Sequence, residues 1–497
     1  MSDDMSARSL GLPPIPPAPS PRRRRWLVPV IALVVLVAGA GAGAFVVLRD
    51  DDTSYPKEWD SRIKPYVDIV EEQRGLTFKH PVNVRFLDDK AFEKTVRTDE
   101  KELDKDDRRE IQETTSLFRA FGLISGDVDL FKAFNDARGS GTLAYYSFDD
   151  KSITVRGKTL ALASRATLVH ELTHALQDQR FDISSRSKKL GKKSSDGEPS
   201  TEGDAFKAIV EGDAERVADL YRATLSKEDR AALEKAEKGD SDKATEGLKG
   251  VPKVVVTLIS SPYALGQAVT EAVASGGNDE IDELFEDPPP DDSVLLDPLK
   301  ALGDLGDGTD VKIPKAEDGE KKFDSGQVGA LVTYLMVAER IPLREALAVA
   351  DSWNGDAYLG FKRKGVLCAR VDYQMRSAAG ATRLAAAFDD WITAAPGSSA
   401  TISHDGARAR FESCDPGKKA KLTNDASEKA LQLVATRGYA GASVVKAGAS
   451  PHVARCFADR LIKEFSIADL SNPKFGADDP EVVRQVQGYA AECRAAG

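Results

Sequence analysis

The most continuous apolar stretch of the chain lies near its beginning, where residues 26–48 carry no charged side chain. A helix of this length rises about 34 Å at about 1.5 Å per residue, enough to cross the hydrocarbon core of a bilayer. Arginines 22–25 precede the stretch, whereas Arg49 and three aspartates follow it. Because positive charge stays on the cytoplasmic side, the pattern predicts a single-pass anchor in the cell membrane with an extracytoplasmic remainder.

A cleaved signal peptide is the alternative for this stretch, because residues 38–40 and 42–44 offer small-residue cleavage sites. The long leading segment and the continuation of the apolar run to Leu48 favour the anchor. Residues 1–25 include a Pro-rich run and predict a disordered cytoplasmic tail. Both interpretations export the rest of the chain.

Beyond residue 48, apolar positions three or four apart predict helices, and alternation of apolar and polar positions predicts strands. The predicted helices cover 56–75, 108–121, 164–179, 204–225, the charged segment 227–249, and 326–350. The predicted strands cover 81–86, 143–148 and 152–155, the last two forming a hairpin. The Ser-, Lys- and Gly-rich segment 181–203 predicts a surface loop. Strands that are few and early, with many later helices, predict an α+β fold.

Composition narrows the class of protein. The 497 residues are 41% hydrophobic, so the chain can bury a sizeable core and is not disordered overall. Its net charge of -11 argues against a general nucleic-acid binder, because that class carries a basic surplus. We divide the chain into a tail (1–25), an anchor (26–48), a main domain (49–415) and a small helical C-terminal region (416–497).

The four cysteines fit an exported chain, since disulfides form in oxidising compartments. Four cysteines allow three pairings. Proximity along the chain favours Cys368–Cys414 and Cys456–Cys493, and the second pair would close the C-terminal helical region. The absence of C-x-x-C spacing argues against a cysteine zinc cluster.

One motif in the sequence indicates metal binding and catalysis. His170, Glu171 and His174 form H-E-x-x-H within the predicted helix 164–179, in a chain with 5 histidines. Residues four apart share a helix face, so both imidazoles can reach one metal ion, and Glu171 beside them can take a proton from a metal-bound water. The bland alternative is a surface helix with two solvated histidines.

A catalytic zinc takes three protein ligands and keeps one position for water. No histidine follows at metzincin spacing, so a downstream glutamate is the better third ligand. Glu-Gly-Asp-Ala occurs twice, beginning at Glu202 and at Glu211. We favour Glu211 because it lies inside an apolar helix pattern, whereas Glu202 follows the predicted loop. Solvated helix-end acids are the alternative for both.

Three neighbours of Glu211 have candidate supporting roles. Ligand histidines donate their second N–H to a carboxylate or carbonyl, which Glu215 or Asp213 could supply. Exposed surface charge is the alternative for each. Gly212 would let another backbone, or the metal-bearing helix, approach closely.

The run 167–179 (TLVHELTHALQDQ), followed by 208–214 (AIVEGDA), resembles a group of bacterial zinc metallopeptidases of the gluzincin type, distantly similar to thermolysin. Further similar pieces are 262–266 (PYALG), 287–290 (DPPP) and 353–358 (WNGDAY), so the likeness covers roughly 80–375. The resemblance implies a zincin-like fold with a small sheet beside two zinc-bearing helices. It also implies His170, His174 and Glu211 as Zn²⁺ ligands and Glu171 as catalytic base.

The sequence departs from this group after Pro290, where DDSVLLDP stands in place of a Ser-Thr-Glu-Gln run ending in His-Pro. Tyr263 and His404 are the candidates for stabilising the tetrahedral oxyanion, and Tyr263 is preferred because His404 lies in a polar stretch outside the matching region. A structural role is the alternative for both. In the implied fold, the strand near 145–148 would bind an extended peptide by strand addition.

Together these patterns predict a membrane-anchored extracytoplasmic zinc metallopeptidase acting on protein or peptide substrates, with no nucleic-acid partner. Two other classes of function are kept open. The first is a non-catalytic envelope protein that uses the metal site as a structural staple or peptide-binding groove. The second is an adhesion or cell-wall scaffold in which residues 425–497 do the work.

Overall fold

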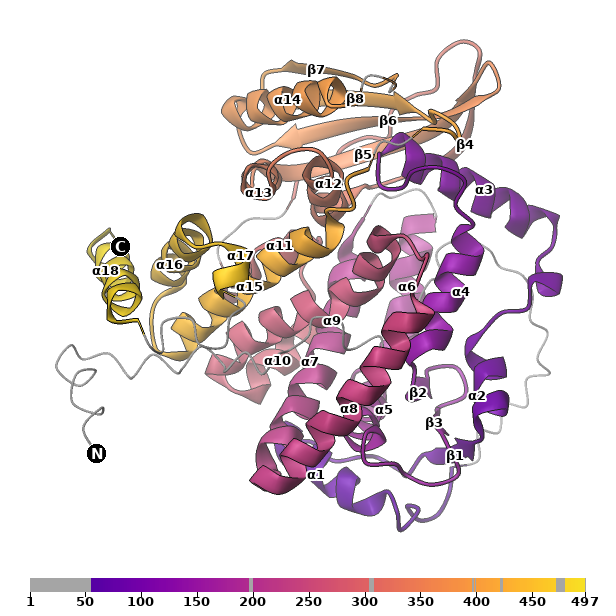
Figure 1. Ribbon diagram of the computed structural model, residues 1–497, viewed down its shortest axis with the longest axis vertical. Coiled ribbons are helices and arrows are strands. Elements are labelled where there is room, and N and C mark those ends of the chain that lie inside the picture. Colours follow the sequence, from indigo (N-terminus) through magenta and orange to yellow (C-terminus); the bar gives the residue numbers. More distant parts are fainter. Residues whose placement is uncertain are drawn as a thin grey trace.

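The computed structural model describes residues 55–195, 200–303, 308–395, 397, 399–420, 423–470 and 479–496. Within these ranges the chain forms a mixed α+β fold with two sheets, as Figure 1 shows, which confirms the predicted class. The predicted tail and the predicted anchor over 26–48 lie outside the described residues. Among the described helices, none combines the length and apolar character that a membrane crossing requires.

The smaller sheet has the strand order β1-β3-β2. Its strands are β1 (Asn83–Leu87), β2 (Ala144–Ser147) and β3 (Ser152–Arg156). β1 runs parallel to β3, and β2 runs antiparallel to it, so β2 and β3 form the predicted hairpin. The Arg156 N–H donates to the Leu143 carbonyl at 2.8 Å. The backbone N–H and C=O groups of successive residues point to opposite sides of a strand. Those of Tyr145 therefore point toward β3, and those of Tyr146 point toward the open edge of β2.

Ten helices precede residue 290 in the described part of the chain. They are α1 (Lys64–Arg74), α2 (Asp89–Val96), α3 (Lys105–Ala120), α4 (Leu130–Gly141), α5 (Ser164–Phe181), α6 (Ile183–Ser195), α7 (Glu202–Thr224), α8 (Lys227–Gly247), α9 (Lys253–Val273) and α10 (Asn278–Glu286). A short 3-10 turn, η2 (Glu100–Glu102), precedes α3. α5 packs against the small sheet on one side and α7 on the other, and α9 lies against α7. These three helices form the centre of the molecule (Figure 1).

Two of the predicted boundaries in this half are wrong. The helix expected from residue 56 begins at Lys64, because Pro65 fits only the first turn of a helix. The segment expected to be a surface loop contains α6. Ile183 is buried and Leu190 is half-buried against the main core. These residues lie seven positions apart, which is two helical turns, so they give α6 a core-facing side.

The second sheet was not anticipated, and the prediction that strands are confined to the early chain is wrong. Five antiparallel strands form it in the order β4-β5-β6-β8-β7. They are β4 (Glu320–Gly326), β5 (Trp353–Arg363), β6 (Val366–Met375), β7 (Thr401–Asp405) and β8 (Arg408–Cys414). In β5 residues 355–357 and 359–361 are all buried. A strand buried on both faces lacks the alternation that a sequence pattern needs.

Helices α12 (Gly329–Ala338), α13 (Leu343–Ala350) and α14 (Ala378–Thr393) follow beside this sheet; α12 and α14 contact its strands, and α13 packs against both of those helices. The first two replace the single helix predicted over 326–350, and Pro342 separates them. Phe388 of α14 stacks on Phe411 of β8, with ring centroids 4.3 Å apart. The Cys368–Cys414 disulfide joins β6 to β8 at directly opposed positions, as predicted.

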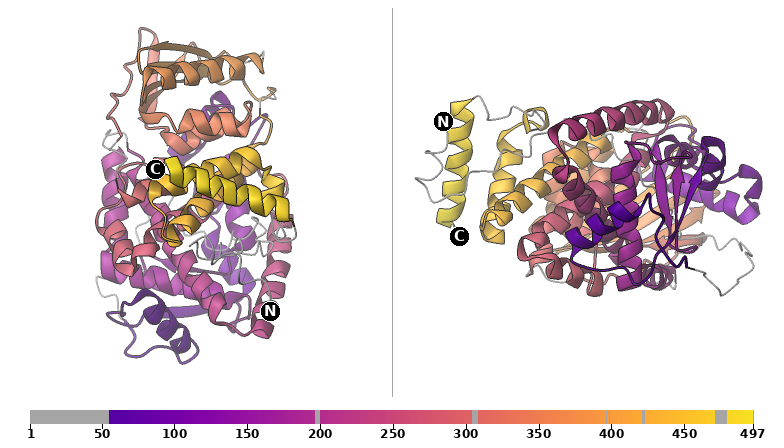
Figure 2. Two further views of the ribbon diagram at one scale, coloured as in Figure 1. Left: turned by 90° about the vertical axis from the view of Figure 1, so that its left-hand side faces the viewer. Right: turned by 90° about the horizontal axis from the view of Figure 1, so that it is seen from below.

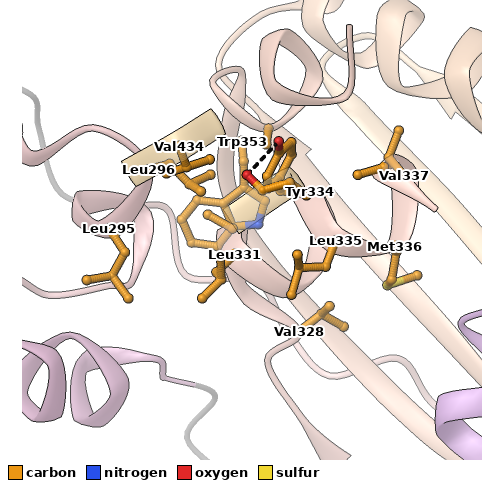
Figure 3. Close-up of a cluster of buried hydrophobic side chains, with 14 of the residues drawn as sticks. Leu295, Leu296, Val328, Leu331, Tyr334, Leu335, Met336, Val337, Trp353 and Val434 are labelled. Atoms are coloured by element: carbon orange, nitrogen blue, oxygen red, sulfur yellow. Dashed lines mark hydrogen bonds between the residues drawn. The ribbon is translucent and has the colours of Figure 1, made fainter. Parts of the chain in front are cut away.

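One hydrophobic core joins the sheet region to the central helices. Its residues come from α11 (Ser293–Leu296), α12, β5 and α15 (Ser427–Lys446), and Figure 3 shows side chains from each of them meeting. The Tyr334 hydroxyl donates to the Ala430 carbonyl at 3.1 Å within it. The sheet is therefore packed firmly against the rest of the chain.

The described C-terminal part is helical. It contains α15, α16 (Pro451–Glu464), α17 (Ile467–Leu470) and α18 (Pro480–Ala496). α15 packs along α9, whereas α16 and α18 lie side by side at the margin of the molecule (Figure 2). The predicted Cys456–Cys493 disulfide joins those two helices. Short 3-10 turns, η3 (Ala274–Gly276) and η4 (Pro298–Leu302), follow α9 and α11.

Candidate metal centre

The H-E-x-x-H motif lies in the middle of α5, which is buried on every side. Residues 166–178 are all buried, because the small sheet, α7 and α1 surround the helix. His170 and His174 are one turn apart, and their ring centroids are separated by 4.6 Å. The predicted helix therefore places both imidazoles on one face, as its spacing requires.

Glu211 reaches the two histidines from α7. Its Oε2 lies 3.3 Å from His170 Nε2 and 3.3 Å from His174 Nε2. One ligand atom from each of the three residues lies within 4.8 Å of the others, and all three side chains are buried. Glu202, the alternative third ligand, stands at the start of α7 and does not belong to this group. The structure thus brings together the three predicted residues in a group that could bind a metal ion.

A test of fit comes from atoms that lack partners. Among the described residues, His174 Nε2 is a buried nitrogen without a hydrogen-bond partner. A buried polar atom that makes no hydrogen bond costs free energy. Two imidazole nitrogens and a carboxylate oxygen are donors that zinc accepts. A divalent cation between the three residues would satisfy Nε2, so the donor set fits a metal ion.

Glu171 lies beside this group without belonging to it. Its Oε2 accepts a 2.7 Å hydrogen bond from the backbone N–H of Tyr146, the residue that faces the open edge of β2. Among the described side chains, its Oε1 is buried with no hydrogen-bond partner. Burial raises the pKa of the Glu171 carboxyl to about 7, although the nearby histidines oppose that rise. A carboxyl with such a pKa can accept and release protons near neutral pH.

Charge coupling dominates the titration of the ligands in the absence of a metal ion. Burial alone would lower the pKa of His170, but hydrogen bonds to Glu211 and Glu215 outweigh it and raise the pKa to about 10. Burial likewise opposes ionisation of Glu211, yet the two histidines lower its pKa to about 2. A proton on His170 therefore neutralises Glu211 where a cation would otherwise do so.

Each histidine has a partner at its second nitrogen. Glu215 Oε2 lies 3.5 Å from His170 Nδ1. Glu215 is therefore the carboxylate beside the second nitrogen of His170, one of the two candidates for that role. His174 Nδ1 lies 3.0 Å from Gln177 Oε1, a partner that the sequence analysis missed. Asp213 contacts Gln177 Nε2 at 3.0 Å and so acts one step further out. The signal for Gln177 was its position three residues after His174, on the same face of α5.

Tyr263 of α9 also belongs to the site. Its ring centroid lies 6.0 Å from that of His170, and its side chain is buried. Burial raises the pKa of the Tyr263 hydroxyl well above its usual value, and the charges of Glu211 and Glu171 and a hydrogen bond to Glu211 add to the rise. His404, the other oxyanion candidate, is exposed on β7 of the larger sheet. Of these two candidates, Tyr263 is the one at the metal-binding group.

Comparisons with known proteins supply no relative of this chain. No family model matches it, and no curated protein and no solved structure matches it either. The resemblance to gluzincin-type metallopeptidases therefore stays a hypothesis that rests on the motif.

Proposed function

We propose that the chain is a zinc-dependent metallopeptidase that hydrolyses peptide bonds. The observation that carries this proposal is the juxtaposition of Glu171 and the buried group of His170, His174 and Glu211. A metal site that only stabilises a fold has no need of a fourth side chain, a carboxylate that does not bind the metal. Within the described residues Glu171 keeps one oxygen without a partner, which supports a role in proton transfer.

The proposed mechanism assigns a task to each side chain. His170, His174 and Glu211 would hold the zinc ion, which supplies a water whose pKa is lowered to about 7. Glu171 accepts the proton of the attacking water and passes it to the leaving amine. The Tyr146 N–H holds Glu171 Oε2 at 2.7 Å, which leaves Oε1 to carry the proton.

The proposed substrate is an extended peptide at the open edge of β2. β2 ends the sheet order β1-β3-β2, and the backbone of Tyr146 faces away from β3. A peptide strand added there would lie beside the residue that holds the proposed base. We further propose that residues 26–48 anchor the chain in the cell membrane with this site on the outer side.

Burial favours a second candidate function, a structural metal site without catalysis. His174 and Glu171 are both 0% exposed, and His170 is 3% exposed. Structural zinc sites are closed to solvent, whereas catalytic ones keep a position open for water. In this alternative the metal ion would fasten α5 to α7.

The test compares Glu171→Gln and His170→Ala with the parent chain, using casein cleavage and bound zinc as readouts. We expect Glu171→Gln to retain zinc and to lose about 10²–10⁴-fold in hydrolysis, the range of general acid–base contributions. His170→Ala should lose both. Undiminished cleavage by Glu171→Gln would exclude the assigned base. The outcome that would instead support a structural metal site has two parts. The parent chain would fail to cleave casein, and a chelator would lower its melting temperature.

A further inference from the structure

The side-chain amide of Gln177 has one allowed orientation. Its Nε2 donates to the Val210 carbonyl at 3.1 Å and to Asp213 Oδ2 at 3.0 Å, and both of those groups are acceptors only. A flipped amide would set its oxygen against those two acceptors. Gln177 Oε1 must therefore face His174 Nδ1, from which it is separated by 3.0 Å.

This orientation determines which nitrogen of His174 carries the proton. An amide oxygen accepts hydrogen bonds and cannot donate them, so His174 Nδ1 must be the N–H donor of the pair. In the neutral imidazole the lone pair then belongs to Nε2. Nε2 is the buried atom 3.3 Å from Glu211 Oε2 that has no hydrogen-bond partner among the described residues.

We propose that Gln177 is a positioning residue that locks His174 in the Nδ1–H tautomer and so directs the Nε2 lone pair into the metal-binding group. The inference rests on the proposed metal site for its consequence, tighter metal binding, whereas the orientation of the Gln177 amide follows from contacts that require no metal. Ligand histidines depend on such partners for ring orientation as well as for tautomer.

Residues of α7 and α1 hold the Gln177 amide in its orientation. Asp213 of α7 accepts from Gln177, and Arg74 Nε of α1 and Arg216 Nη2 lie 2.9 Å and 3.1 Å from its two oxygens. Arg74 is 1% exposed and Asp213 is 0% exposed, so the charges are compensated where water cannot screen them. Arg74 Nε pairs with the same oxygen, Oδ2, that accepts from Gln177 Nε2, and Arg216 pairs with Oδ1. The Val210 carbonyl and the arginine-paired Asp213 oxygen both face Gln177 Nε2, and these contacts keep the Gln177 amide in its orientation.

A matched pair of variants on one helix tests the metal-binding consequence. Gln177→Met removes the acceptor at His174 and keeps the length of the side chain. Gln179→Met is the control, because Gln179 also bridges chain segments, through Lys79 N at 2.7 Å and the His80 carbonyl at 3.0 Å, without contacting His174. In the full chain, with Zn²⁺ alone competed against a chelator, Gln177→Met should weaken affinity about 10–100-fold. Gln179→Met should stay within about twofold. Equal affinities in the two variants would overturn the assignment.

The second readout is the tautomer itself, measured by ¹⁵N NMR on metal-free, histidine-labelled chain at alkaline pH. The 5 histidines of the sequence keep this spectrum simple, and His174→Ala assigns the signal. We expect the Nδ1–H form in the parent and a mixture in Gln177→Met. An Nε2–H form in the parent would overturn the proposal, even if Gln177→Met failed to fold. A parent that binds no zinc but shows the Nδ1–H form would contradict the proposed function and still support the lock.

Discussion

Gly212 of α7 and Gly266 of α9 face each other where the two helices cross. A Cβ atom built on Gly212 would lie 2.1 Å from the backbone carbon of Gly266, and one built on Gly266 would lie 1.7 Å from the Ala208 carbonyl oxygen. Two side-chain-free residues therefore let the helix backbones touch. Glu211 precedes Gly212, and Tyr263 lies one turn before Gly266. The contact consequently places the Tyr263 hydroxyl against Glu211.

Gly212→Ala should destabilise the protein by about 3 kcal/mol, the upper part of the range for overpacking, because the obstructing atoms are backbone. It should also weaken metal binding, since α7 carries Glu211. Urea unfolding and zinc competition measure the two effects.

Gly239→Ala serves as the control for that substitution. Gly239 lies in α8, and an added Cβ there meets nothing within 4 Å. Alanine should raise stability at this position by about 0.5–1 kcal/mol through its better helix propensity. If both variants behaved alike, the helix crossing would not be as close as described.

Metal uptake should release a proton from His170. Its pKa of about 10 without metal means that the ring is charged at pH 8, whereas a ligand imidazole must be neutral. Binding therefore displaces about one proton, and apparent affinity rises about tenfold per pH unit below pH 10. Calorimetry in two buffers of different ionisation enthalpy counts the proton. The exposed His452 provides a control, because His452→Ala should leave the count unchanged.

Asp292 should make stability fall as pH rises toward neutrality. This buried side chain accepts from Ala330 N at 2.9 Å and Leu331 N at 3.0 Å at the start of α12. Burial raises its pKa from 3.8 to about 7, more than those bonds lower it. The folded chain therefore binds the proton more tightly than the unfolded chain, and the free energy of unfolding decreases between about pH 4 and pH 7.

Asp292→Asn should flatten this part of the stability profile, which urea unfolding at several pH values would record. The exposed Asp310 gives the matched control, and Asp310→Asn should retain the parental slope. An unchanged slope in Asp292→Asn would assign the dependence to other carboxyls. Asp292 also accepts from the Thr201 hydroxyl at 3.1 Å, directly before α7, so the same variant should lower stability at every pH.

Removal of the Cys456–Cys493 disulfide should cost about 4 kcal/mol by the chain-entropy relation for the loop it closes. The two cysteines are 37 residues apart and join α16 to α18. Loss of the link should release α18 first, so hydrogen exchange should quicken there before it does in α15. Uniform acceleration across α15 and α18 would contradict this local effect.

Local features of the fold followed from the sequence because their causes are local. The β2–β3 hairpin and the helix under the H-E-x-x-H motif depend on alternation and on helical spacing. The two disulfides followed proximity along the chain. The larger sheet escaped prediction because β5 is buried on both faces and shows no alternation. α6 escaped because a Lys- and Ser-rich composition concealed the spacing of Ile183 and Leu190.

The sequence by itself determined the pairing of His170 with His174, since side chains four residues apart on a helix lie on the same face. Only the tertiary structure decided that Glu211 meets them, because that contact depends on how α7 packs against α5. The same holds for the chain from His174 through Gln177 and Asp213 to Arg74, whose last member comes from α1. Contacts between distant segments depend on the packing of whole helices, and no short window of sequence contains that information.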